Sequence, residues 1–227
     1  MGMGKTGLAT FVFLSLAAAL VRAADTNHPH PHQGILPPYE PFPPEIFLDE
    51  KQQDRLADGK MVVMTIENMD TGGTGIGVID IAAPGDMVWS RITGFEYYPL
   101  WIKPVKVCEI YHQAGDTINT HVKISGFLYK YEYFLTNVLW PEHGTMTWTL
   151  DYTRESDFDD CVGLWFVEPH PVKAGWSRAW FSSDLKLRSP IPGFLMKFIK
   201  KKGIKDAISW VKEQSELAVE RNARAGK

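Results

Sequence analysis

The sequence predicts an α+β fold in which a curved antiparallel sheet of about seven strands wraps around one long C-terminal helix, with two short helices after the first strand. A β-prone run ends at Pro84-Gly85, and two short helical turns follow before Pro99 and Pro104 stop them. Further β-prone runs come next, and their short joins favour antiparallel neighbours. The last long segment repeats apolar residues every three or four positions, as an amphipathic helix does. This order of elements predicts an enclosed space between the sheet and the helix.

The composition limits the classes of protein that fit. The chain has 227 residues, enough for one large domain with tails, and we place that domain at residues 61–221. A formal net charge of −3 argues against a general nucleic-acid binder, which needs a basic excess. No window approaches the roughly 18 consecutive apolar residues of a membrane-spanning helix. The domain is therefore predicted to fold in water, with no nucleic-acid partner.

The first 23 residues have the pattern of a secretory signal peptide. Lys5 supplies a positive charge, residues 8–20 form an apolar core of suitable length, and a small residue at Ala23 offers a cleavage site. This pattern predicts entry into the secretory pathway and a secreted or lumenal location, periplasmic in a bacterium. An uncleaved signal anchor is the alternative, although the apolar stretch is short for spanning a bilayer.

Residues 24–60 are predicted to form an arm rich in Pro and His, followed by a short helix at about residues 44–57. The prolines disfavour a helix or a central strand in the arm. His28, His30 and His32 alternate along it and could hold a metal ion weakly from one side of an extended chain. Such tracts are more often simply solvated. No Cys/His cluster has ligand spacing, so no metal or cofactor is expected.

Turn-forming residues separate eight runs of strand-forming composition. The runs cover residues 61–67, 75–81, 105–111, 117–124, 127–140, 145–152, 162–168 and 176–187. Gly73, Gly75 and Gly77 invite comparison with a dinucleotide-binding loop, but a strand follows them instead of a helix. We therefore assign these glycines to a hairpin or a sheet edge. Cys108 and Cys161 fall in different strands, where a disulfide or two buried free thiols would both fit.

The C-terminal helix is predicted to begin near Pro192, which suits a first helical turn. Gly203 weakens the helix interior by about 1 kcal/mol, so a bend or break is expected there. Residues 222–227 are predicted to be a charged tail.

One predicted strand places three tyrosines on a common face. Tyr129, Tyr131 and Tyr133 alternate with Lys130 and Glu132, so the phenols lie opposite the charged side chains. Buried hydroxyls need hydrogen-bond partners, which a ligand, water or other side chains would supply. The next two strands add large apolar side chains to this wall. These are Met146, Trp148, Leu150 and Trp165. Residues that line a cavity and residues that fill a core give the same pattern, so both interpretations stay open.

Arg178 shares a strand face with Trp176 and Trp180. An inward Arg178 would anchor a carboxylate or carbonyl group between the indoles. The opposite face is more core-like, which favours an outward Arg178. Acid–base candidates are dispersed and give no catalytic pair at motif spacing. They are Glu96, His121, His143 and Asp151.

Four short segments, taken in order and spacing, resemble the START-like (helix-grip, SRPBCC) superfamily, and specifically its coenzyme Q-binding and polyketide cyclase-like branch. They are Ala83-Pro84-Gly85-Asp86-Met87-Val88-Trp89, Phe95-Glu96-Tyr97-Tyr98-Pro99-Leu100-Trp101, Gly163-Leu164-Trp165-Phe166 and Pro192-Gly193-Phe194-Leu195. The resemblance extends over residues 76–214. It implies a helix-grip fold that binds hydrophobic molecules between sheet and helix, while a minority of such proteins catalyse cyclisation or dehydration. A secretory leader differs from the mitochondrial or cytosolic setting of many relatives.

Together these features predict a non-enzymatic protein that binds or transfers a hydrophobic small molecule or lipid, such as a quinone, fatty acid, sterol or polyketide-like compound. Trp101 from the second segment and Phe194 and Phe198 from the last helix complete the candidate ligand-binding residues. The alternatives are a polyketide cyclase or dehydratase-like enzyme with the same cavity, and a structural or partner-binding domain with a filled core.

The start of the last helix also carries a basic cluster beside its apolar residues. The cluster comprises Lys197, Lys200, Lys201 and Lys202. This combination predicts peripheral contact with an anionic membrane, and the alternative is an ordinary solvated helix face.

Overall fold

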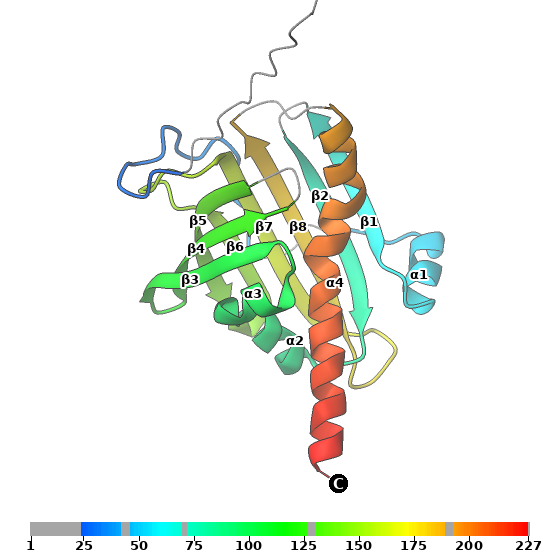
Figure 1. The fold of residues 1–227 in the computed structure, drawn as a ribbon. Coiled ribbons are helices and arrows are strands. Elements are labelled where there is room, and N and C mark those ends of the chain that lie inside the picture. The colour runs from blue at the N-terminus through cyan, green and yellow to red at the C-terminus, as the bar shows by residue number, and fades with distance from the viewer. Residues whose placement is uncertain (1–23, 42–45, 70–71, 127–129, 189–192, 227) are drawn as a thin grey trace, which may run out of the picture.

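The computed structural model describes residues 24–41, 46–69, 72–126, 130–188 and 193–226, with side chains at all of these except 65–69, 72, 73 and 193–202. Its centre is one sheet with the strand order β1-β2-β8-β7-β6-β5-β4-β3, every neighbouring pair antiparallel. The strands are β1 (Val62–Met69), β2 (Gly72–Ile81), β3 (Val105–Ala114), β4 (Thr117–Ser125), β5 (Lys130–Trp140), β6 (Thr145–Leu150), β7 (Phe158–Pro169) and β8 (Ser177–Leu187). The sheet curves around the long helix α4 (Figure 1). The predicted α+β class and helix-grip architecture are confirmed, and each of the eight predicted runs corresponds to one strand of the described sheet.

Two short helices connect β2 to β3, as predicted. Helix α2 spans Gly85–Ile92, and after the 3₁₀ turn η1 (Phe95–Tyr97) comes α3 (Tyr98–Trp101). Pro84 precedes α2, where its fixed φ and missing N–H cost nothing. Buried Val88, Ile92 and Phe95 attach this connection to the main core. The helices therefore close one end of the space between sheet and α4.

Helix α4 runs without a break over Gly193–Ala225. The predicted break at Gly203 is therefore wrong, and residues 222–225 of the predicted tail belong to the helix. Ile208, Trp210 and Val211 are buried in the main core, and this packing outweighs the roughly 1 kcal/mol that one glycine costs. None of the described helices is long and apolar enough to cross a bilayer.

Glycines in β2 let α4 lie close to the sheet. A Cβ on Gly75 would come within 1.8 Å of Ile204 Cδ1, and one on Gly77 within 1.9 Å of Ile208 Cδ1. The predicted hairpin is confirmed, because β1 and β2 are consecutive antiparallel partners, and the sheet-edge alternative is wrong, because β2 lies between β1 and β8. Gly75 and Gly77 also form the contact surface for the helix.

The His- and Pro-rich arm packs against the sheet on the face opposite α4, the convex face. His30 is buried, with its Nε2 2.8 Å from the carbonyl oxygen of Phe158. The backbone N–H of Leu36 donates to Asp160, and Ser182 donates to the hydroxyl of Tyr39. The solvated interpretation therefore holds for His28 and His32, which are exposed, but is wrong for His30. The groups that fix the arm have partners more than a hundred residues away in the chain.

A second element also covers the convex face. Helix α1 (Glu50–Ala57) begins at a capping box, in which Asp49 accepts from the Gln52 N–H and Gln52 accepts from the Asp49 N–H. Its Leu56 packs with Val62 and Val78 in a small separate core.

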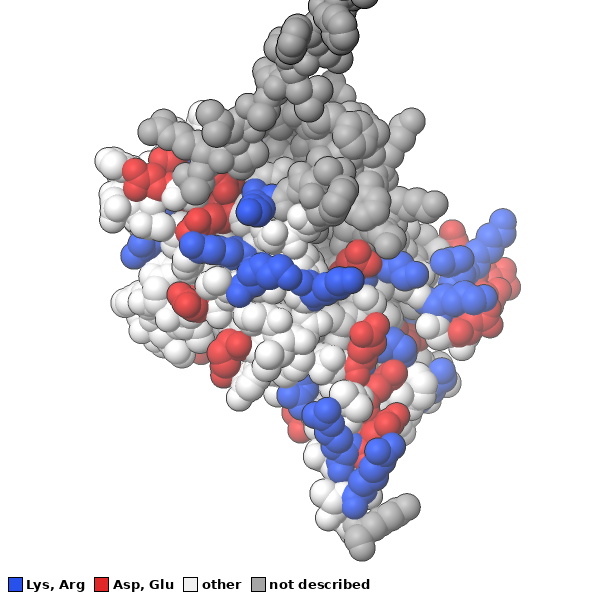
Figure 2. Space-filling view, viewed as in Figure 1, with Lys and Arg blue, Asp and Glu red and all other residues white. Residues whose placement is uncertain are grey.

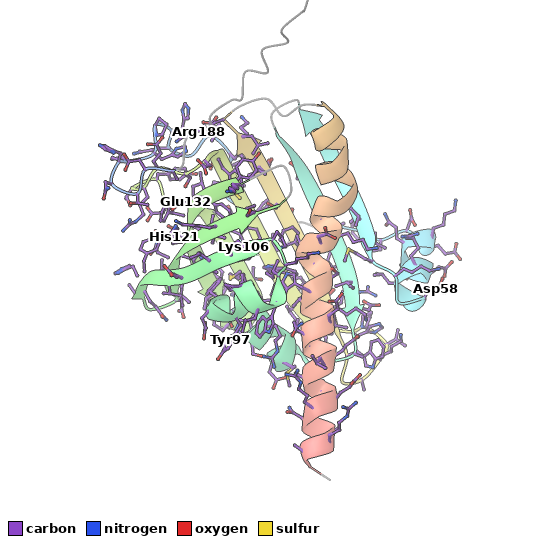
Figure 3. All side chains as sticks on the ribbon, in the orientation of Figure 1. Asp58, Tyr97, Lys106, His121, Glu132 and Arg188 are labelled. Atoms are coloured by element: carbon purple, nitrogen blue, oxygen red, sulfur yellow. The ribbon has the colours of Figure 1, made fainter. Side chains whose placement is uncertain are left out.

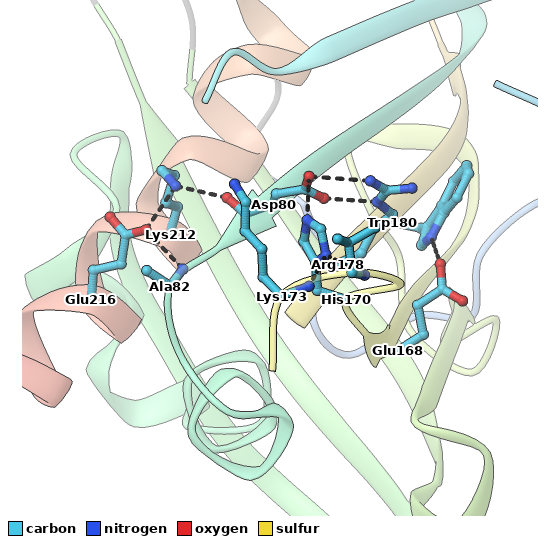
Figure 4. Close-up of polar contacts among 10 residues, drawn as sticks. Asp80, Ala82, Glu168, His170, Lys173, Arg178, Trp180, Lys212 and Glu216 are labelled. Carbon is cyan, nitrogen blue, oxygen red and sulfur yellow. Dashed lines mark hydrogen bonds and ion pairs between the residues drawn. The ribbon is translucent and has the colours of Figure 1, made fainter. Parts of the chain in front are cut away.

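A polar network joins β2, β8, the β7–β8 loop and α4 (Figure 4). The buried carboxylate of Asp80 accepts from Arg178 Nε at 2.7 Å and from Arg178 Nη2 at 3.1 Å, and lies 3.0 Å from His170 Nε2. Lys212 of α4 donates to the Asp80 carbonyl at 2.7 Å, and Glu216 accepts from the Ala82 N–H at 2.9 Å. Arg178 therefore points outward, as predicted, and the network fixes the C-terminal half of α4 to the end of β2.

Candidate functional site

The face of the sheet that points toward α4, the concave face, carries an aromatic wall on β5. Tyr131 and Tyr133 lie opposite Ile124 and Val122 of β4 in the antiparallel register. Their rings contact Phe158 at centroid distances of 5.2 and 4.7 Å. Both tyrosines are only partly buried although they adjoin the main core. This part of the wall therefore keeps accessible aromatic surface.

The neighbouring strands carry the other predicted wall residues, and these are more deeply buried. Met146, Trp148, Leu150 and Trp165 are 1 to 7 % exposed and belong to the main core. The Trp148 indole lies close to Gly163, where a Cβ would come within 2.1 Å of it. On this side the core-filling interpretation describes the packing.

A chain of aromatic rings leads from this core to the surface. Trp165 lies 6.4 Å from Trp210 of α4, Trp210 stacks on Trp101 at 6.0 Å, and Trp101 stacks on Tyr97 at 5.1 Å. Trp101, predicted as a ligand-binding residue, thus lies between the core and an exposed tyrosine. Trp210 was not predicted, although its position three residues after Ala207 on the apolar stripe of α4 was a usable signal.

Seven of the predicted residues cannot be placed at the site. Tyr129 and the side chains of Phe194, Phe198, Lys197, Lys200, Lys201 and Lys202 fall outside the described residues. Their backbone, except at Tyr129, is the first part of α4.

A groove of about 660 Å³ lies between the α3 region and the edge strand β3. Glu96 and Pro99 line one side, and residues 106–110 of β3 line the other. Figure 3 labels Lys106 and Tyr97 on this part of the molecule. Because alternate residues of a strand point to opposite faces, five consecutive lining residues place the groove along the open edge of β3. Sequence reasoning missed this groove, since it depends on which strand ends up at the edge.

The ionisable groups buried near the concave face are held in their neutral forms. Burial raises the pKa of Cys108 to about 12, with the carboxylates of Glu96 and Glu109 adding to the effect. Burial also raises the pKa of Tyr98 well above its usual value. Cys108 and Cys161 are both free thiols, which resolves the open question of a disulfide. At neutral pH Cys108 is a small apolar group and not a nucleophile.

The dispersed acid–base candidates do not come together. His121 lies on the convex side of β4, stacked on Phe134 at 4.6 Å and 2.7 Å from Glu132 (Figure 3). Asp151 accepts a hydrogen bond from Tyr111 on the same side. Burial opposes the charge of Asp151, but hydrogen bonds from Thr153 and Tyr111 outweigh it and hold the pKa of Asp151 below its usual range. Glu96 and His143 are exposed. The described residues contain no cluster of three metal-ligating side chains.

Comparison with known proteins agrees with this geometry. A family model described as polyketide cyclase/dehydrase and lipid transport matches residues 81–210. No curated protein matches the chain.

Three solved structures share the fold at low sequence identity. A STAR-related lipid transfer protein fragment from Xanthomonas axonopodis has a TM-score of 0.55 at 12 % identity, over 69 % of this chain and 92 % of its own. The Zhui aromatase/cyclase from Streptomyces sp. R1128 has a TM-score of 0.54 at 13 % identity, over 70 % of this chain and 96 % of its own. A START superfamily protein from Mycobacterium smegmatis has a TM-score of 0.52 at 16 % identity, over 70 % of this chain and 98 % of its own. Because the family model covers more than half of the sequence, this chain belongs to the family described as polyketide cyclase/dehydrase and lipid transport.

Proposed function

We propose that the protein binds a hydrophobic small molecule or lipid between β4, β5 and α4, and transfers it. The observation that carries this proposal is the partly buried aromatic wall of Tyr131 and Tyr133 on the concave face. Apolar contact contributes about 25 cal/mol per Å² of ligand surface, and the phenol hydroxyls add orientation. A quinone, fatty acid, sterol or polyketide-like compound fits this chemistry.

Binding is favoured over catalysis by the placement of the acid–base residues. Cyclisation and dehydration need a positioned acid–base group, whereas His121 and Asp151 lie on the convex side of the sheet and Glu96 and His143 are exposed. A polyketide cyclase or dehydratase-like activity is the second candidate, since the family description includes it. Turnover of a polyketide substrate by the purified protein would establish that alternative.

Titration of a fluorescent fatty acid tests the binding site. Tyr131→Ala and Tyr133→Ala are expected to weaken binding several-fold, because each removes aromatic contact area from the wall. Trp140→Ala is the matched control: Trp140 is also a partly buried aromatic residue of β5, but it points to the other face. Equal affinities in all folded variants would refute the wall as the binding surface. Organic extraction and mass spectrometry of the purified protein would identify a bound natural ligand.

We also propose that residues 1–23 are a cleaved leader and that the mature protein enters the secretory pathway. Lys5, the apolar run at residues 8–20 and Ala23 support this proposal. Sequencing the N-terminus of the protein from its native host is expected to start at Ala24, and an intact Met1 would contradict cleavage.

Peripheral membrane contact is part of the same proposal, because a carrier must meet the bilayer that supplies its ligand. The basic cluster at the start of α4 supports it, since each lysine near an anionic surface contributes about 1 kcal/mol. Replacing Lys200, Lys201 and Lys202 together with Glu is expected to reduce co-sedimentation with anionic vesicles at low salt. Unchanged co-sedimentation would exclude this cluster as a contact.

A further inference from the structure

The short helix α3 exposes apolar side chains to solvent. Leu100 is 79 % exposed and Tyr97 is 47 % exposed, only three positions apart. Trp101, the next residue after Leu100, stacks on Tyr97. Exposing a large aliphatic side chain to water is unfavourable, and covering it lowers the free energy. We call Tyr97, Leu100, Trp101 and the adjoining Arg91 the α3 patch.

Arg91 is the second unusual feature of the patch. Its guanidinium lies over the Trp101 ring at 5.3 Å, and Nη2 contacts only the Met87 sulfur at 3.3 Å. Its Nε is buried, and no described group hydrogen-bonds to it. Among the described residues the guanidinium therefore has no carboxylate partner. A guanidinium with free donors is well matched to the oxygens of a phosphate.

The charges around the patch are mixed. Lys103 and Lys106 are exposed and follow the patch directly in the chain, whereas Glu96 and Glu109 are exposed acidic neighbours. Figure 2 shows a row of basic side chains across the face that carries β3 and α4. Figure 3, in the same orientation, labels Lys106 on β3 in this part of the molecule. The lysines can therefore face an anionic surface while Leu100 and Tyr97 enter it.

We propose that the α3 patch docks the protein on a phospholipid bilayer, with Arg91 bound to a lipid phosphate and Leu100 inserted among the acyl chains. Tyr and Trp favour the headgroup level of a bilayer, which is where Tyr97 and Trp101 would then lie. The inference rests on the proposed lipid-carrying function and names a second membrane-contact surface for the carrier. This surface differs from the start of α4, which lies at the other end of the fold (Figure 1).

Site-specific fluorescence tests the contact directly. Cys108 and Cys161 are buried thiols, and burial raises the pKa of each to about 12, so the parent protein should take up little thiol-reactive dye. Leu100→Cys, Phe47→Cys and Lys201→Cys would each carry one environment-sensitive dye. Phe47 is the matched control, because it is 85 % exposed but lies beside α1 on the far side of the sheet. On vesicles of phosphatidylcholine with phosphatidylglycerol, the dye at position 100 is expected to shift to the blue, and the dye at position 47 is not.

Binding measurements separate the phosphate contact from general charge attraction. Leu100→Glu is expected to reduce vesicle co-sedimentation about tenfold or more, while Phe47→Glu leaves it unchanged. Arg91→Gln should weaken binding to pure phosphatidylcholine as well, because that lipid also carries a phosphate. Lys103→Gln and Lys106→Gln should weaken binding about fivefold each on anionic vesicles only. Glu96→Gln should strengthen it there.

Three outcomes would overturn the inference: a dye response at position 201 but not at position 100, equal loss from Leu100→Glu and Phe47→Glu, or no vesicle binding by the parent protein at low salt. Titration of a fluorescent fatty acid in vesicle-free buffer keeps the two proposals distinct. If that titration succeeds while docking fails, the binding function stands and the α3 patch is not a membrane contact.

Discussion

At Gly77 the absence of a side chain sets the position of a helix. A Cβ there would come within 1.9 Å of Ile208 Cδ1. Gly77→Ala is therefore expected to push α4 away from β2 and lower the free energy of unfolding by about 1 to 3 kcal/mol. Ile208→Val removes the clashing methyl group, so the double variant should recover part of the loss.

Urea unfolding followed by circular dichroism measures these effects. Gly203→Ala is the control of opposite sign, because Gly203 is exposed in the same helix and alanine should stabilise it by about 1 kcal/mol. Equal stability of Gly77→Ala and the parent would contradict the close approach of α4.

Asp157 is a carboxyl group whose charge the fold disfavours. Burial raises its pKa and the Glu132 carboxylate adds to this, against the hydrogen bond that Asp157 accepts from the Glu132 N–H. Because the pKa of Asp157 is higher in the folded protein, its protonation stabilises the fold at pH values below the unfolded-state pKa of about 3.9. This stabilisation is lost as the pH rises through the folded-state pKa. Asp157→Asn keeps an acceptor oxygen without the charge.

The variant is therefore expected to melt at a higher temperature than the parent at pH 7, and the difference should shrink toward pH 3. Melting curves across this range measure it. A difference that grows as the pH falls would show that the sign of the pKa shift is wrong.

At the scale of elements, the arm is held by a few buried polar contacts. The His30 ring is buried, and its Nε2–H donates to the Phe158 carbonyl. His30→Ala removes that bond and leaves a cavity, so it is expected to lower the free energy of unfolding by about 2 to 3 kcal/mol. His28→Ala is the control, since the His28 side chain is 70 % exposed and pairs only locally with Asp25. Equal effects of the two variants in urea unfolding would argue against arm docking.

The elements that sequence reasoning predicted well are those with a period. Alternation identified the strands, and spacings of three and four identified α4. The arm was misread because its contacts are single hydrogen bonds to distant residues such as Asp160, which leave no periodic trace. The break predicted at Gly203 failed because propensity is a local quantity, whereas core packing by Ile208 and Val211 is not.

For the molecule as a whole, ligand binding should change only part of the structure. The wall of Tyr131 and Tyr133 is partly accessible, whereas Trp148 and Trp165 are packed in the core. Adding palmitate is expected to slow amide hydrogen exchange in β4 and β5, with little change in β1 and α1. Mass spectrometry of exchanged peptides measures this. Uniform protection, or protection confined to β1 and α1, would contradict the proposed site.

For the candidate site, the sequence predicted which strand residues face the helix, but not which of them border a ligand. Strand period placed Tyr131 and Tyr133 correctly, but no pattern could show which large side chains would fill space and which would border it. That division depends on Trp210 and on Gly163, whose missing side chain makes room for the Trp148 ring. Both are tertiary effects that one sequence does not encode locally.

The arm also decides how the protein should be produced. Val162 and Leu164 of β7 are each 1 % exposed. They alternate with the core-facing Cys161 and Trp165, so they lie on the convex face, where the arm packs. A recombinant version trimmed to residues 61–221 would lack the arm and α1, and would offer bare aliphatic surface for aggregation. Expression should therefore retain residues 24–60 and carry its affinity tag after Ala225, where α4 extends beyond the sheet (Figure 1).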